Sequence, residues 1–202
     1  FSRAEMAFVS LALASLSFDG LSETFFWLGL IGENPLEFTG RSAVVRVNTA
    51  GLAATWAVTA GLLWAVLALG RRLGGERFAA GPLMLSFLAI AAGYHIAHHL
   101  VTLLGSGQFL ILALNDPLFR GDEMLGLPTF FVSFGFLTDP AMMSLIYAAQ
   151  FAAVLGAHLL AVVLVMTRAG SSARAVAHLP MTGLMVVYTV FGLWLLSTAR
   201  GV

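Results

Sequence analysis

The sequence predicts an all-α membrane protein, a bundle of about five transmembrane helices forming one domain over residues 1–202. Of the 202 residues, 59% are apolar and only 10% are charged, and the mean hydropathy is +0.93. Soluble domains carry roughly 25% charged residues, so a water-soluble fold could not cover this much apolar surface. The chain lacks cysteine, which excludes disulfides and cysteine-bound metals. Its zero formal net charge gives no indication of a nucleic-acid partner.

Four spans follow from long apolar runs, because a membrane-crossing helix needs about 20 apolar residues. They are expected at about residues 48–69, 82–104, 140–166 and 180–198. The start of the third run is well marked, since Asp139 can cap a helix and Pro140 suits its first position.

The first span is less regular than the others. Apolar runs at residues 6–16 and 25–31 flank a polar stretch at residues 17–24. We interpret this region as one span interrupted near Gly20, because a broken helix is tolerated where protein or water covers the backbone. In the alternative, Asp19 caps a helix that begins near Gly20, with Glu23 in its first turn.

Arginines indicate the orientation. One short loop holds Arg71, Arg72 and Arg77, and a second holds Arg168 and Arg174. With five spans both loops lie on one side, which the positive-inside rule makes cytoplasmic. We therefore expect a multi-pass protein of the bacterial inner membrane, with its N-terminus in the cytoplasm and its C-terminus in the periplasm.

The longest connection, residues 105–139, is then a periplasmic loop. It contains two short apolar segments, residues 107–114 and 129–137, which are expected to lie at the membrane interface.

Small residues recur every four positions in two of the spans, which favours close helix packing against a neighbour or a second subunit. The series are Ala149, Ala153, Ala157 and Ala161, then Ala148, Ala152 and Gly156, and in the other span Ala89, Gly93 and Ala97. The expected partners are the lipid bilayer and other membrane subunits or further copies of the chain.

Carboxylates and imidazoles fall at a shared depth. At ~1.5 Å per residue from the outer end of each span, Glu23, His95 and Gln150 all lie about 12–13 Å deep. Asp19 precedes Glu23 by four residues, as His95 precedes His99, so each pair occupies one helix face.

This pattern predicts a metal site with the ligands Asp19, Glu23, His95 and His99. Imidazole and carboxylate suit Zn, Cu, Fe or Mn. The alternative ligands or supporting residues are His98, Gln150 and Tyr147. A hydrogen-bonded network without metal explains the same pattern, and a transport pathway is a third interpretation.

Three other polar features are interpreted without a functional role. His158 is expected to be a hydrogen-bonded packing residue, and Tyr188 a buried residue that needs a partner. The segment Gly40–Ser42 is interpreted as an ordinary polar connection.

Four stretches resemble a group of proteobacterial membrane proteins labelled fenitrothion hydrolase. They are residues 17–29 (SFDGLSETFFWLG), 40–42 (GRS), 94–98 (YHIAH) and 188–194 (YTVFGLW). The label implies phosphotriester hydrolysis, typically metal-assisted, and Asp19, Glu23, His95 and His98 fall within the matching stretches. Members of the group are usually longer, with further spans ahead of this region, which would fit a chain that begins at Phe1.

Two functional hypotheses follow. In the first, an outward-facing metal site carries out metal-assisted hydrolysis, because a bound metal generates hydroxide from water. In the second, the chain is a non-catalytic subunit of a larger bioenergetic complex, with histidines that ligate haem or chlorophyll or contact partners. A transporter ranks third, because paired broken helices are expected there and only one interrupted segment occurs.

Overall fold

The computed structural model describes residues 2–38, 40–75, 80–128, 132–168 and 175–198. Within them the chain is helical, and five helices are long and apolar enough to cross a membrane, as the sequence predicts. The six α-helices are α1 (Arg3–Ser22), α2 (Phe25–Leu30), α3 (Val45–Gly74), α4 (Ala80–Asn115), α5 (Pro140–Arg168) and α6 (Leu179–Ser197). Short 3-10 turns are η1 (Arg41–Val44), η3 (Gly135–Leu137) and η4 (Ala175–His178). Arg77, Arg174 and residues 129–131 of the expected interfacial segment lie outside the described ranges.

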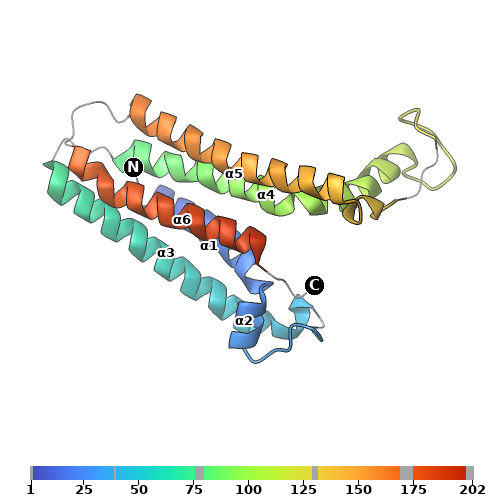
Figure 1. Ribbon diagram of the computed structural model, residues 1–202, viewed down its shortest axis with the longest axis horizontal. Coiled ribbons are helices and arrows are strands. Elements are labelled where there is room, and N and C mark those ends of the chain that lie inside the picture. The colour runs from blue at the N-terminus through green and yellow to red at the C-terminus, as the bar shows by residue number, and fades with distance from the viewer. Residues whose placement is uncertain (1, 39, 76–79, 129–131, 169–174, 199–202) are drawn as a thin grey trace. The chain divides into compact units, whose positions relative to one another are not determined.

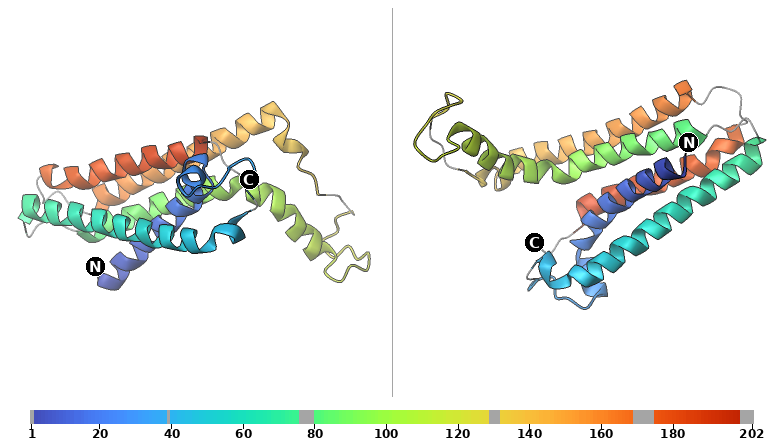
Figure 2. Two further views of the ribbon diagram at one scale, coloured as in Figure 1. Left: turned by 90° about the horizontal axis from the view of Figure 1, so that it is seen from below. Right: turned by 180° about the vertical axis from the view of Figure 1, so that it is seen from behind.

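The chain divides into two compact units, residues 1–95 with 154–202, and residues 96–153. In the first unit α1, α3 and α6 lie side by side, as two further views also show (Figures 1 and 2). Its core gathers apolar side chains from each long helix of the unit, among them Leu13, Leu63, Phe87, Ala161 and Met181. Burial of this set holds the first unit together, since each apolar side chain removed from water or lipid gains packing contacts.

The first span is interrupted just beyond Gly20. Helix α1 runs through Gly20 and ends at Ser22, so Asp19 is part of α1 and does not cap a new helix. Thr24 closes one helix and opens the next, because its hydroxyl donates to the Leu21 carbonyl at 2.7 Å and accepts the Trp27 N–H at 3.1 Å. Helix α2 has six residues, about 9 Å at ~1.5 Å per residue, and is too short to cross on its own.

Trp27 fixes α2 against α1 and α3. Its indole N–H donates to Asn48 Oδ1 at 2.9 Å, and its ring meets Phe18 edge to face at 5.0 Å between centroids. Both rings press on Gly51, where an added Cβ would lie 2.6 Å from each. A larger residue at this crossing of α1, α2 and α3 would therefore force the two rings to move.

Helix α4 is longer than expected. It has 36 residues, about 54 Å at ~1.5 Å per residue, whereas the hydrocarbon core is about 30 Å thick. The expected loop start at Gly105 is too early, and the segment 107–114 is the last part of the helix and not a separate interfacial piece. The helix ends at Asn115 because Asp116 precedes Pro117, and the residue before proline disfavours the helical conformation.

The second unit is the outer half of α4, the connection and the first half of α5. Gln108 donates to the Ser133 carbonyl at 2.9 Å and accepts the Ser133 N–H at 3.0 Å. The side chain of buried Asn115 accepts the Leu125 N–H at 3.1 Å and donates to the Leu127 carbonyl at 2.9 Å. These two amide side chains order a connection that has little regular structure of its own.

Candidate functional site

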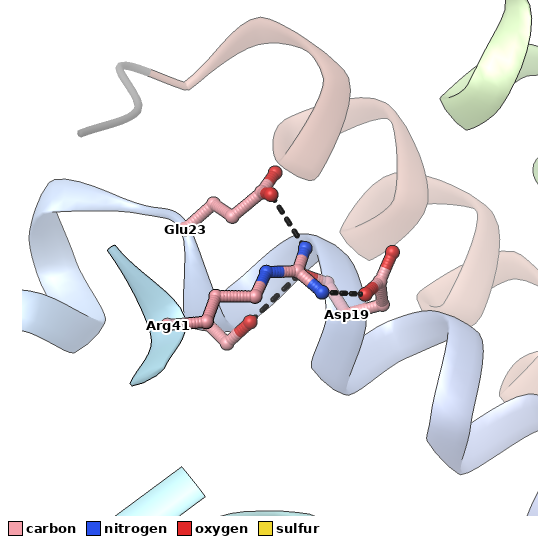
Figure 3. Close-up of polar contacts among 4 residues, drawn as sticks. Asp19, Glu23 and Arg41 are labelled. Carbon is pink, nitrogen blue, oxygen red and sulfur yellow. Dashed lines mark hydrogen bonds and ion pairs between the residues drawn. The ribbon is translucent and has the colours of Figure 1, made fainter. Parts of the chain in front are cut away.

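Arg41 lies between the two acids of α1. Its Nη1 is 2.6 Å from Asp19 Oδ1, and its Nη2 pairs with Glu23 Oε1 (Figure 3). The spacing of four residues places both carboxylates on one side of α1, where the end of the helix faces η1. The planar guanidinium offers its donors in a fork, so one arginine can hold both acids at once.

This arrangement corrects the expectation for residues 40–42, which are not an ordinary polar connection. The Asp19 and Glu23 side chains are 26% and 21% exposed, so they are largely withdrawn from solvent, whereas Arg41 is 51% exposed. A buried carboxylate requires a partner for its charge. Arg41 supplies part of that compensation for both acids, and a formal charge of −1 remains on the three groups.

A cavity of about 370 Å³ adjoins this ion pair, between α1 and the beginning of α3. Asp19, Ser22, Arg41 and Asn48 contribute polar atoms to its wall. The cavity lies within the first unit, and Asp19 forms part of its wall.

The histidines of α4 have different environments. His95 is exposed, His99 is half-buried, and His98 is only 8% exposed. The rings of His98 and His99 meet edge to face with their centroids 4.8 Å apart. The imidazole pair in contact is thus His98 with His99, whereas the sequence spacing pointed to His95 with His99.

Helix α5 supports this part of α4 through Gln150. The buried amide Nε2 of Gln150 donates to the Ala97 carbonyl at 2.8 Å, next to His98 in the chain. Tyr147, one turn earlier on α5, is 57% exposed. Gln150 is therefore engaged by the α4 backbone, and Tyr147 is placed on an outer surface.

Within the second unit, His98 and His99 offer two imidazoles that could serve as metal ligands. His99 belongs to the predicted ligand set, whereas His98 was expected only as an alternative ligand, and Asp19 stays a predicted carboxylate ligand. Glu23 is engaged by Arg41 and His95 is exposed. The full ligand set drawn from the sequence stays a prediction.

Two other polar residues of the described spans, His158 and Tyr188, have hydrogen-bond partners. Thr189 Oγ1 lies 2.7 Å from His158 Nδ1, which confirms His158 as a hydrogen-bonded packing residue. The Tyr188 hydroxyl donates to the Leu13 carbonyl at 3.0 Å and accepts from Ser17 Oγ. Burial raises the cost of leaving such a hydroxyl unpaired, so these bonds tie α6 to α1.

No family model, curated protein or solved structure matches this chain. The resemblance to proteins labelled fenitrothion hydrolase therefore stays a prediction.

Proposed function

We propose that this multi-pass membrane protein binds one divalent transition metal through the adjacent imidazoles of His98 and His99, with Asp19 as the carboxylate ligand that the sequence predicts. The observation that carries the proposal is the pair of adjacent imidazoles on α4, one buried and one half-buried, with their rings in contact. Imidazole within a span is costly and is typically retained for a functional partner. Imidazole together with a carboxylate suits Zn, Cu, Fe or Mn.

Arg41 sets the charge at the proposed site. It contacts Oδ1 of Asp19, and a carboxylate can serve two partners because it has two oxygens with several lone pairs. A metal would engage the other oxygen. The positive charge of Arg41 repels a metal cation bound nearby. Replacing Arg41 with a neutral residue should therefore strengthen metal binding relative to wild type.

The reaction class that suits this site is metal-assisted hydrolysis at the outer side of the membrane. Three protein ligands leave a fourth position for water, and a metal lowers the pKa of bound water enough to form hydroxide near neutrality.

Metal content tests the binding proposal. Purified protein loaded with Zn²⁺ and then desalted should retain about one ion per chain by elemental analysis. His98→Ala, His99→Ala and Asp19→Asn should each lose most of it, because each removes one donor of three. The matched control is His95→Ala, which removes an exposed imidazole from the same helix and should retain the ion.

Two outcomes would overturn the proposal. The proposal is wrong if the wild-type protein retains no metal after loading. Loss of metal in His95→Ala, with retention in His98→Ala, would return the ligand role to the residue that sequence spacing favoured. A visible haem or chlorophyll spectrum in protein from its native membrane would instead support the pigment-binding subunit.

Activity is tested separately with a chromogenic phosphotriester and a carboxylic ester. Zn²⁺-loaded wild type should hydrolyse at least one of them, and His98→Ala should lose at least tenfold in rate if the metal generates the nucleophile. If metal-loaded protein hydrolyses neither ester, the proposed reaction is wrong, whereas the proposal of metal binding is unaffected.

A further inference from the structure

A second cavity lies at the opposite end of α1 and α3 from Arg41. It has a volume of about 570 Å³ and is formed by the first turn of α1 and the last turns of α3. Arg3 and Arg71 contribute its charged wall, and Met6, Trp64 and Leu67 its apolar wall. It lies within the first unit and shares no residue with the cavity beside Asp19.

The cavity carries an excess of positive charge. Neither Arg3 nor Arg71 forms an ion pair with a described carboxylate, in contrast to Arg41. The nearest acid in sequence is Glu5, whose carboxylate accepts the Ser2 N–H at 2.6 Å in the capping box of α1. Among the described residues no carboxylate pairs with either guanidinium, and the N-terminal end of α1 adds a partial positive charge.

The residues of this wall favour a ligand that has an anionic group next to an apolar part. Arginine forks match the oxygens of a phosphate in paired hydrogen bonds. Trp64 is 65% exposed, and tryptophan is enriched where a helix meets the headgroup layer. Basic pockets between transmembrane helices are known to take anionic lipid headgroups.

We propose that this cavity binds the phosphodiester headgroup of an anionic phospholipid. Arg3 and Arg71 hold the phosphate, and Met6, Leu67 and Trp64 pack against the glycerol and the upper acyl chain. A soluble phosphate would share the contacts to the two arginines but leave the apolar wall uncovered. The inference stands apart from the metal site and does not depend on it.

Tryptophan quenching by brominated lipid tests the proposal in detergent micelles. The chain has 4 tryptophans, so the Trp64 signal is obtained as the difference between wild type and Trp64→Phe. Brominated phosphatidylglycerol should quench this signal at a concentration roughly 25-fold lower than brominated phosphatidylcholine, because each of the two arginines near an anionic headgroup contributes about a factor of five.

The double variant Arg3→Gln with Arg71→Gln should abolish that preference. The matched control is Arg72→Gln, which changes the neighbouring arginine in the same last turn of α3 but not the cavity wall, and it should keep the preference. Circular dichroism and gel filtration report whether each variant is folded.

Three results would overturn the inference, and the first two need only the wild-type protein and Trp64→Phe. Equal quenching of Trp64 by the two brominated lipids removes the preference for an anionic headgroup. Full reversal of the quenching by millimolar inorganic phosphate would assign the site to a soluble anion. Persistence of the lipid preference in the folded double variant would remove the role of the two arginines.

Discussion

Arg41 joins two carboxylates that lie one turn apart on α1, and its loss leaves both largely buried acids without this cation. Arg41→Ala should therefore lower the free energy of unfolding by about 1–3 kcal/mol, between the values typical of exposed and buried pairs. Arg41→Lys should recover only part, because an ammonium lacks the planar fork. Denaturant unfolding in detergent measures both.

The control for this prediction is Arg46→Ala, which removes an exposed arginine one turn further along the same segment. It should unfold with the wild-type midpoint. A midpoint for Arg41→Ala equal to that of Arg46→Ala would show that the ion pairs do not stabilise the junction of α1 and η1.

The sequence predicted the two acids correctly as neighbours on one helix face but missed their partner. Periodicity places residues that share a helix, such as Asp19 and Glu23. The segment between α2 and η1 has no periodicity, so its path, and the return of Arg41 to α1, could not be read from spacing. The same limit applies to the imidazoles, because spacing favoured His95 and His99, whereas ring contact joins the adjacent His98 and His99.

Asp116 organises the turn that follows α4. Its two carboxylate oxygens accept the backbone N–H groups of Arg120 and Gly121, each at 2.8 Å. The bond from Arg120 is the main cause that lowers the pKa of Asp116 below the usual value, with the bond from Gly121 also contributing. Because the pKa is lower in the folded state, the ionised carboxylate stabilises the turn. This stabilisation is fully present above the usual aspartate pKa and is lost as the pH falls through the lowered pKa of the folded state.

Amide hydrogen exchange at Arg120 and Gly121 checks this. Protection should be present near neutral pH and fall on acidification below the usual aspartate range, after correction for the intrinsic exchange rate. In Asp116→Ala protection should be low at every pH, because neither carboxylate oxygen is present. Equal protection of the two amides in Asp116→Ala and wild type would contradict the assignment.

Among the elements, the crossing of α1, α2 and α3 depends on a single glycine. Alanine favours a helix interior over glycine by about 1 kcal/mol, so Gly51→Ala would stabilise an isolated α3. In the folded chain the new Cβ meets the Phe18 and Trp27 rings at 2.6 Å. Forcing these rings aside should cost about 1–3 kcal/mol, the usual cost of overpacking, which exceeds the gain in helix propensity. Gly51→Ala should therefore lower the midpoint of thermal unfolding.

Gly61→Ala on the same helix is the matched control, because nothing lies within 4 Å of its added Cβ. It should leave the protein equally or slightly more stable, so the two substitutions are expected to differ in sign. If both variants stabilise the protein, the rings of Phe18 and Trp27 can move aside at little cost.

The span positions of the elements were predictable because apolar run length is a strong signal, and the five runs correspond to five long helices. Their ends were less predictable. Gly105 and Gly107 resembled a helix end, but apolar residues on both sides continue the helix until Asp116 and Pro117. The break after α1 was placed near Gly20, whereas Thr24 supplies the side-chain bonds that end α1 and begin α2.

At the scale of the whole molecule, five membrane-crossing helices would place the start of α1 and the end of α6 on opposite sides of the membrane. It follows that the connections after α3 and α5 share one side, and that the connection between α4 and α5 lies on the other. The arginines near the end of α3 predict that the first side is cytoplasmic. The absence of cysteine makes this testable, because a single introduced thiol is labelled without background.

Asp122→Cys in the connection between α4 and α5 should react with a membrane-impermeant maleimide applied to cells whose inner membrane is intact. Arg72→Cys at the end of α3 should react only after the inner membrane is permeabilised. Both side chains are exposed, so a difference in labelling reports their side of the membrane and not their burial.

Labelling of both before permeabilisation would contradict an odd number of spans between them. The reverse pattern would keep five spans and invert the orientation, which would place the cavity at Arg3 and Arg71 in the outer leaflet.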